Sequence, residues 1–175
     1  AVLQSLEVVG MTAAQLAQVD LSGTAVGART AAALAGAPII ELRLGRTGVA
    51  RAAAALAPLA PTLRRLDLSD QDVDDASVAW LGTAVGLTEV ALGGTKVGDA
   101  TVRQVLTLPA LRDLDLAETR VTAPAAAALA TLATLETLDL SATRVDDGAA
   151  AALLALPALT MVRLDDTTVG DRALA

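Results

Sequence analysis

Residues 135–159 read LETLDLSATRVDDGAAAALLALPAL, and the pattern they contain decides the fold. Their opening phrase, L-x-x-L-x-L-x-x-T-x-V, begins seven units, with Val or Ile replacing some leucines and Gln71 replacing one threonine. The starts lie 23 or 24 residues apart, at Leu16, Ile39, Leu63, Leu87, Leu111, Leu135 and Leu159. A fixed period of this length is the signature of a repeat protein.

Each unit combines strand and helix signals. The L-x-L core alternates with period two, as at Leu138 and Leu140, which indicates a strand with one buried face. Downstream, aspartates such as Asp146 stand where a helix begins, and Pro124 stands where proline is tolerated at a helix start. Prolines such as Pro157 stop the helix before the next strand. We therefore expect a strand, a turn and a helix in each unit.

Stacking of these units predicts the architecture. A unit of 24 residues cannot bury both of its faces alone, so the units must pack side by side. We expect an α/β solenoid: a right-handed arc with a parallel sheet of seven strands on the concave side and α-helices on the convex side. A single domain should cover residues 1–175, with a truncated amino-terminal unit over residues 1–15 and seven repeats over residues 16–175, the last incomplete.

These registered copies resemble leucine-rich repeats over almost the whole chain. The phrase LDLSATRVDDGAAAALLALPAL is similar to the bacterial type with 24-residue repeats, and the Ala-rich helices resemble those of plant-pathogen effectors. The family usually has Asn at the ninth position, whereas Thr fills six of the seven units here. Because a hydroxyl has fewer donors than an amide, we expect a thinner hydrogen-bond ladder between units. The resemblance implies a non-enzymatic module for protein recognition.

The composition excludes several classes of function. Without Cys or His the chain has no disulfide framework, no Ser-His-Asp triad and no site with Cys or His ligands for a metal, so we expect no cofactor and no enzyme. A formal net charge of -7 repels phosphate, and one Trp cannot form a base-stacking platform, so we expect no nucleic-acid partner. No stretch reaches the roughly 20 strongly apolar residues of a membrane span. We expect a cytoplasmic protein, with a secreted effector as the alternative.

The net charge gathers on one face. If the leucines point inward, positions three, five, seven and eight of each unit project from the concave side. They hold eleven acids and four bases, a difference of -7 that equals the formal net charge of the chain. The acids are Asp20, Glu41, Asp67, Asp70, Glu89, Asp113, Asp115, Glu118, Asp139, Asp165 and Asp166, and the bases are Arg43, Arg46, Arg65 and Arg163.

Two sets of side chains are candidates for binding a partner. The acidic strip, on the concave face, comprises Asp67, Asp113, Asp115, Glu118, Asp139, Arg163 and Asp165. Within it, Asp115 and Asp139 should be lateral neighbours on strands about 4.8 Å apart. The basic row, at position ten on the rim of the sheet, comprises Lys96, Arg120 and Arg144. A partner with a basic surface fits the strip; the alternative is a solvated face without a partner.

Three weaker signals need separate interpretation. Trp80, the only aromatic residue, is a candidate anchor for a partner, and we expect it to be partly buried between neighbouring helices. Asp70, Asp72 and Asp74 have the D-x-D-x-D spacing of a calcium loop but lack its glycine and its closing glutamate, so we expect a solvated turn and no metal. Neighbouring carboxylates on an open sheet lack the contrasting environments that an acid/base pair needs.

The sequence as a whole predicts recognition of a basic protein partner by the concave sheet. One alternative is the targeting or regulatory array of a larger bacterial enzyme or effector, with the catalytic domain elsewhere; another is a structural spacer. The seventh unit ends before a complete helix and has no recognisable polar cap. We therefore expect either further repeats in a longer protein or association through this carboxyl-terminal end.

Overall fold

Seven parallel strands form one sheet in chain order in the computed structural model, which describes residues 17–170. Each strand residue pairs with the residue at the same position of the next unit, so the whole sheet shares one register. The predicted unit over residues 1–15 lies outside the described residues. The strands are β1 (Gln18–Asp20), β2 (Glu41–Arg43), β3 (Arg65–Asp67), β4 (Glu89–Ala91), β5 (Asp113–Asp115), β6 (Thr137–Asp139) and β7 (Met161–Arg163).

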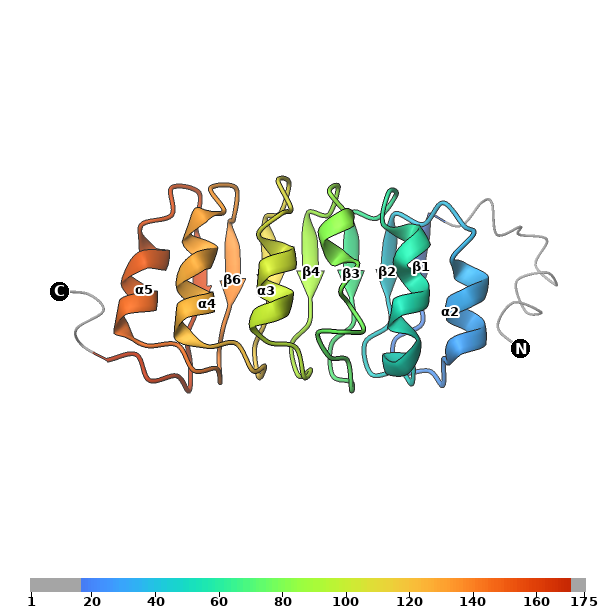
Figure 1. Ribbon diagram of the computed structural model, residues 1–175, viewed down its shortest axis with the longest axis horizontal. Coiled ribbons are helices and arrows are strands. Elements are labelled where there is room, and N and C mark those ends of the chain that lie inside the picture. Colours follow the sequence, from blue (N-terminus) through green and yellow to red (C-terminus); the bar gives the residue numbers. More distant parts are fainter. Residues whose placement is uncertain (1–16, 171–175) are drawn as a thin grey trace.

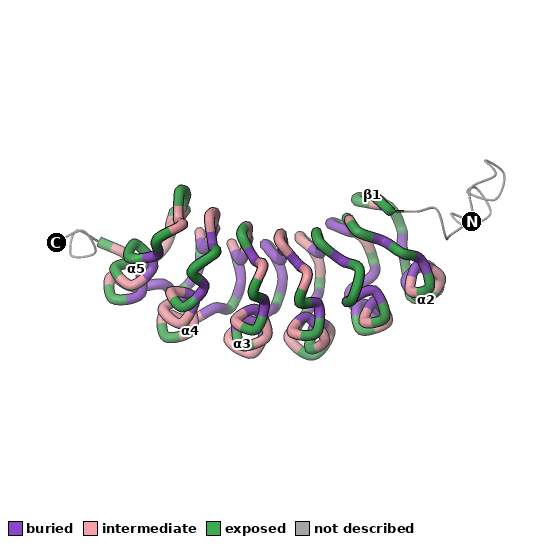
Figure 2. The backbone as a smooth tube through the Cα atoms, turned by 90° about the horizontal axis from the view of Figure 1, so that it is seen from above, coloured by how far each residue is buried: buried purple, intermediate pink, exposed green. Residues whose placement is uncertain are grey.

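Helical segments cover one face of this sheet. Figure 1 shows them side by side in front of the strands, and Figure 2 shows that the molecule curves with the strands on the inner side. The predicted α/β solenoid arc is thus confirmed. The α-helices are α2 (Ala28–Leu34), α3 (Asp99–Val105), α4 (Ala123–Ala128) and α5 (Asp147–Leu154), and the 3-10 helices are η2 (Ala50–Leu59), η3 (Leu81–Thr83) and η4 (Leu129–Thr131).

The core lies between the sheet and the helical layer. The central strand residues Leu114 and Leu138 are 3% and 2% exposed, while their strand neighbours at positions three and five are only partly buried. The predicted inward residues of the convex segments are also buried, namely Leu34, Leu56, Leu81, Val105, Leu129 and Leu153. The period-two and helical patterns in the sequence therefore assign the core correctly, and the concave side chains point away from it.

The prediction of an α-helix in every unit is wrong for the second and third full units. The second has the 3-10 helix η2, which contains Pro58; proline has no N–H and its ring clashes with the carbonyl four residues earlier, which disfavours the α form. The third has only η3, preceded by a turn in which Asp74 accepts hydrogen bonds from the amide and hydroxyl of Ser77. Side-chain bonding of this kind competes with helix formation.

The turn after each strand has the same backbone form in all seven units. The residue at position eight has a positive φ, between 53° and 69°, whether or not it is glycine: Gly23, Arg46, Asp70, Gly94, Glu118, Ala142 and Asp166. At position nine, each threonine hydroxyl donates to the position-six carbonyl of its own unit, as Thr119 does to Leu116 at 2.6 Å. Gln71 also bonds to the preceding unit: its amide donates to the Leu44 carbonyl as well as to that of Leu68, and its side-chain oxygen accepts the Thr47 hydroxyl.

Candidate protein-binding surface

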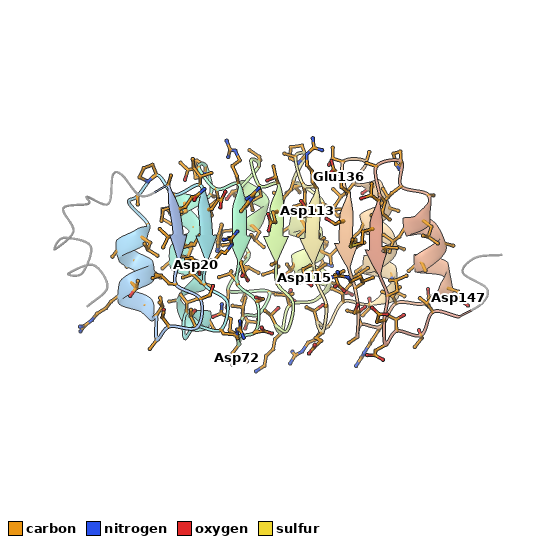
Figure 3. All side chains as sticks on the ribbon, turned by 180° about the vertical axis from the view of Figure 1, so that it is seen from behind. Asp20, Asp72, Asp113, Asp115, Glu136 and Asp147 are labelled. Atoms are coloured by element: carbon orange, nitrogen blue, oxygen red, sulfur yellow. The ribbon has the colours of Figure 1, made fainter. Side chains whose placement is uncertain are left out.

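A shallow hollow lies on the concave face over β4 to β7. Its volume is about 280 Å³, and its acidic lining side chains come from positions three and five of adjacent strands. Figure 3 views this face of the sheet and shows Asp113 and Asp115 on it. Four members of the acidic strip line the hollow, namely Asp113, Asp115, Asp139 and Arg163, together with Glu89, Met161, Ala91, Thr137 and the central residues of three strands. The structure thus brings together the part of the strip that lies on β5, β6 and β7.

The position-five aspartates also stabilise the turns that follow their strands. In Asp20, Asp67, Asp115 and Asp139, one carboxylate oxygen accepts the backbone N–H two residues later, at 2.9 to 3.0 Å. This local bond is a turn device that aspartate is well suited to make. The repeated LDLS phrase therefore has a structural cause, and each of these carboxylates has one oxygen committed to the backbone.

Most acids of the hollow have a partner within the sheet. Arg65 lies between two glutamates, 3.1 Å from Glu41 and 3.0 Å from Glu89. Thr137 donates its hydroxyl to Asp113 across the neighbouring strands. Asp139 pairs with Arg163 at 3.4 Å on the other side. These contacts link adjacent units, and the two arginines offset the charge of the nearest acids.

Asp115 differs from the other acids of the hollow. Among residues 17–170 its carboxylate accepts a hydrogen bond only from the Ala117 amide, and it has no ion-pair partner. Burial raises the pKa of Asp115 above its ordinary value, and the nearby charges of Asp139 and Asp67 raise it further. As predicted, Asp115 and Asp139 are paired neighbours on parallel strands. Asp115 is therefore the acid of the hollow with the least compensation.

Other members of the acidic strip lie outside the hollow. Asp67 is on β3, two strands from Asp115, and Glu118 and Asp165 are exposed in the turns after β5 and β7. Conversely, Met161 is not a member of the acidic strip, yet it lines the hollow and is 49% exposed. Its place in the sequence could have indicated this, because Met161 is at position three of its unit, where the preceding units have charged or polar residues.

The basic row occupies the rim as expected. Lys96, Arg120 and Arg144 are exposed, and their backbone amides donate to position-eleven carbonyls of the preceding units, at 2.8, 2.9 and 3.3 Å. Lys96 forms an ion pair with Asp72, whose position on this rim is visible in Figure 3. Within residues 17–170, Arg120 and Arg144 have no ion-pair partner.

Side chains of the D-x-D-x-D segment are engaged within the protein. Asp70 lies 3.9 Å from Arg46, and Asp72 pairs with Lys96. Hydrogen bonds from Ser77 lower the pKa of Asp74 below its ordinary value. The three aspartates thus have separate partners rather than a common centre.

Trp80 contacts the preceding unit on the convex side. It directly precedes η3, where an α-helix was expected, and it is partly buried as predicted. Its indole N–H donates to the Ala53 carbonyl in η2 at 3.1 Å. This bond joins the second and third full units, whose convex segments are the 3-10 helices η2 and η3. A role for Trp80 as an anchor for a partner stays a prediction.

Comparison with known proteins supports the fold assignment. No protein-family model matches the chain, and no curated protein matches its sequence. A solved internalin, inlF of Listeria monocytogenes, is similar at 17% identity and a TM-score of 0.74, covering 91% of this chain and 44% of the internalin chain. Internalin C2 of the same organism is similar at 22% identity and a TM-score of 0.60, covering 89% of this chain and 74% of its own. This protein thus spans less than half of the first internalin.

The architecture is that of a bacterial-type leucine-rich repeat protein, with seven parallel strands in an open sheet. The predicted resemblance is therefore confirmed at the level of the fold. In residues 17–170, no helix has the length and apolar character that would be needed to cross a bilayer.

Proposed function

We propose that this protein is a non-enzymatic recognition module that binds a basic protein partner on the concave face, centred on Asp115. The hollow over β4 to β7 carries this proposal, because it joins a depression of about 280 Å³ to a carboxylate without an ion-pair partner in residues 17–170. The leucine-rich repeat fold is consistent with protein recognition, although fold alone does not determine function.

Charge and apolar surface in the hollow favour a lysine or arginine side chain. Asp115 and Asp139 lie on adjacent strands, where two carboxylates about 4.8 Å apart repel by about 1 kcal/mol in water. A cation placed between them would remove this repulsion. The exposed side chain of Met161 can cover the aliphatic stem of such a residue, since long basic side chains bury their methylenes on apolar surface.

A targeting or regulatory array within a larger bacterial enzyme or effector is the alternative. The exposed side chain of Met161 on β7 and the partly buried Val162 and Leu164 also support association through the carboxyl-terminal end. Association through this end would cover Met161 at one side of the hollow and leave Asp115 on β5 accessible. We propose a cytoplasmic location, with secretion as an effector as the alternative.

A differential pull-down tests the concave surface. Asp115→Asn and Asp139→Asn, combined, remove two charges but keep the oxygen that accepts the Ala117 or Ser141 amide. The double variant should fold like the native protein and lose partners that the native protein captures at low salt. Asp20→Asn with Asp74→Asn is the matched control, since both residues accept local backbone N–H groups away from the hollow.

The proteins captured by the native protein and by the two double variants are then compared. Partners that are retained by the control and lost from the Asp115/Asp139 variant would support concave binding. Partners that both double variants capture equally would show that binding uses another surface.

A further inference from the structure

The side chains of the basic row project to solvent because the residues before and after each of them, at positions nine and eleven, are buried. At position nine, Thr119 is 8% exposed, and at position eleven, Val121 is fully buried; the intervening Arg120 therefore projects to solvent. The same pattern holds around Lys96 and Arg144. Because their amides donate to the preceding units, the three residues stand in line at the spacing of the repeats.

Acids on the same rim are fixed by backbone donors. Asp75 accepts the amides of Gly98 and Thr101, at 2.9 and 3.0 Å. Asp99 accepts the Thr122 amide at 2.9 Å, and Asp146 caps α5 by accepting the Ala149 amide at 2.9 Å. Asp75 and Asp99 thus hold successive units together, and Asp146 caps the helix of its own unit. None forms an ion pair with Arg120 or Arg144 in the described part of the chain.

The exposed arginines therefore suit a carboxylate ligand from outside. Because these cations follow one another at the spacing of adjacent units, they repel, and an anionic ligand would offset this repulsion. A guanidinium binds a carboxylate through two parallel hydrogen bonds, a geometry that lysine cannot provide. We propose that Lys96, Arg120 and Arg144 bind an acidic segment of a protein partner, so that the partner's docking surface is bipolar: basic over the hollow and acidic over the rim.

Protein carboxylates fit this row better than nucleic-acid phosphates do. The formal net charge of -7 opposes approach of a long polyanion, while a short acidic segment next to basic residues is attracted by both surfaces. Trp80 uses its N–H within the protein and lies on the convex side, so it offers no stacking surface beside the row. The bipolar partner rests on the proposed function, but binding of an acidic segment to the row can be measured separately.

Titration of the isotope-labelled protein with hexaglutamate at low salt, followed by amide chemical shifts, provides the test. We expect the largest shifts at Lys96, Arg120 and Arg144. Arg120→Glu with Arg144→Glu should weaken binding at least tenfold, the order expected when two exposed ion pairs become repulsive. The control, Arg29→Glu with Arg103→Glu, changes the net charge equally at two exposed arginines on α2 and α3 and should retain binding.

The remaining outcomes separate the row from the hollow. Asp115→Asn with Asp139→Asn should leave hexaglutamate binding intact, and a result of this kind would stand even if the pull-down showed no concave binding. Absence of binding, shifts away from the row, or an equal loss in both arginine variants would overturn the proposal. Tighter binding of hexathymidylate than of hexaglutamate would also overturn it, in favour of a phosphate ligand.

Discussion

The aspartates at position five both stabilise the turns that follow the strands and contribute negative charge to the concave face. Each carboxylate in Asp20, Asp67, Asp115 and Asp139 accepts a backbone amide in the following turn, and the same groups give the concave face its negative charge. An acidic concave face can therefore arise from turn stability alone. Asp115 packs closely on the neighbouring unit, because a Cβ at Gly93 would lie 2.7 Å from its Oδ2, whereas a Cβ at Gly45 would lie 3.3 Å from the Asp67 carboxylate.

A pair of adjacent substitutions tests the register of the strands. Leu138 is 2% exposed in the core, so Leu138→Ala should lower the free energy of unfolding by about 2 to 5 kcal/mol. Asp139→Asn should change it by less than about 0.5 kcal/mol, because the amide oxygen still accepts the Ser141 N–H. Denaturant melts measure both values, and equal losses would contradict the register.

The raised pKa of Asp115 predicts a dependence of stability on pH. Because the folded protein holds this proton more tightly than the unfolded chain, the stability contributed by Asp115 falls as pH rises from the unfolded value of 3.8 through the folded pKa. Asp115→Asn should therefore be more stable than the native protein at neutral pH, with the difference shrinking as pH falls towards 3.8. Urea melts across this range measure the difference.

Asp20→Asn is the control with the opposite sign. Hydrogen bonds from Ser22 lower the pKa of Asp20, so the native carboxylate adds stability above the unfolded value of 3.8 and loses it as pH falls through the folded pKa. The Asp20 variant should thus be the less stable one at neutral pH. The same trend in both variants would rule out burial as the cause of the Asp115 effect.

Each repeated turn places one residue in the left-handed backbone region. Glycine occupies this position in two units, and residues with a Cβ occupy it in five, at φ of 53° to 55°. For a residue with a Cβ this conformation costs about 1 kcal/mol or more. The turns are therefore strained in most units, and the ladder of hydrogen bonds between units must hold them in place.

A glycine substitution tests this strain at Ala142. Ala142→Gly should raise the free energy of unfolding by up to about 1 kcal/mol, because glycine adopts positive φ without a steric penalty. Ala151→Gly, at an exposed position in α5, should lower it by about 1 kcal/mol. Thermal melts distinguish the two signs; destabilisation by both substitutions would contradict the turn geometry.

The strands could be predicted from the sequence more fully than the convex segments could. Alternating leucines determine the strand register because a slip of one residue would expose Leu138 and its equivalents. The segment Ala50–Leu59 is Ala-rich and favours an α-helix by propensity, yet it forms a 3-10 helix around Pro58. In the third unit the bond from Trp80 to Ala53 depends on the adjacent unit, which local sequence does not reveal.

Charge on the concave face was predictable, but its arrangement was not. The repeat register assigns Asp113, Asp115 and Asp139 to one face, and the structure places all three around the hollow. The reach of Arg163 to Asp139 and of Thr137 to Asp113 depends on side-chain conformation across strands. These contacts leave Asp115 as the acid of the hollow that has neither an ion-pair partner nor a hydrogen bond from another side chain in residues 17–170, which the count of charges could not show.

At the scale of the whole molecule, the arc separates two kinds of surface. The hollow carries the carboxylates of β4 to β6, and the rim carries the exposed cations Lys96, Arg120 and Arg144, five to seven residues further along the same units. Complementary charge of this kind chiefly raises the rate at which partners associate. Its effect is screened over a distance of about 10 Å at 0.1 M salt, so it should be strongly dependent on ionic strength.

The association rate of a captured partner as a function of salt tests the concave surface most directly. For the native protein we expect a steep fall in the rate constant with rising salt. Asp115→Asn with Asp139→Asn should associate about tenfold more slowly at low salt, with a shallower salt dependence and an unfolding midpoint no lower than that of the native protein. The Asp20→Asn, Asp74→Asn control should follow the native protein. Equal rates and equal salt dependence for the native protein and the Asp115/Asp139 variant would contradict binding at the hollow.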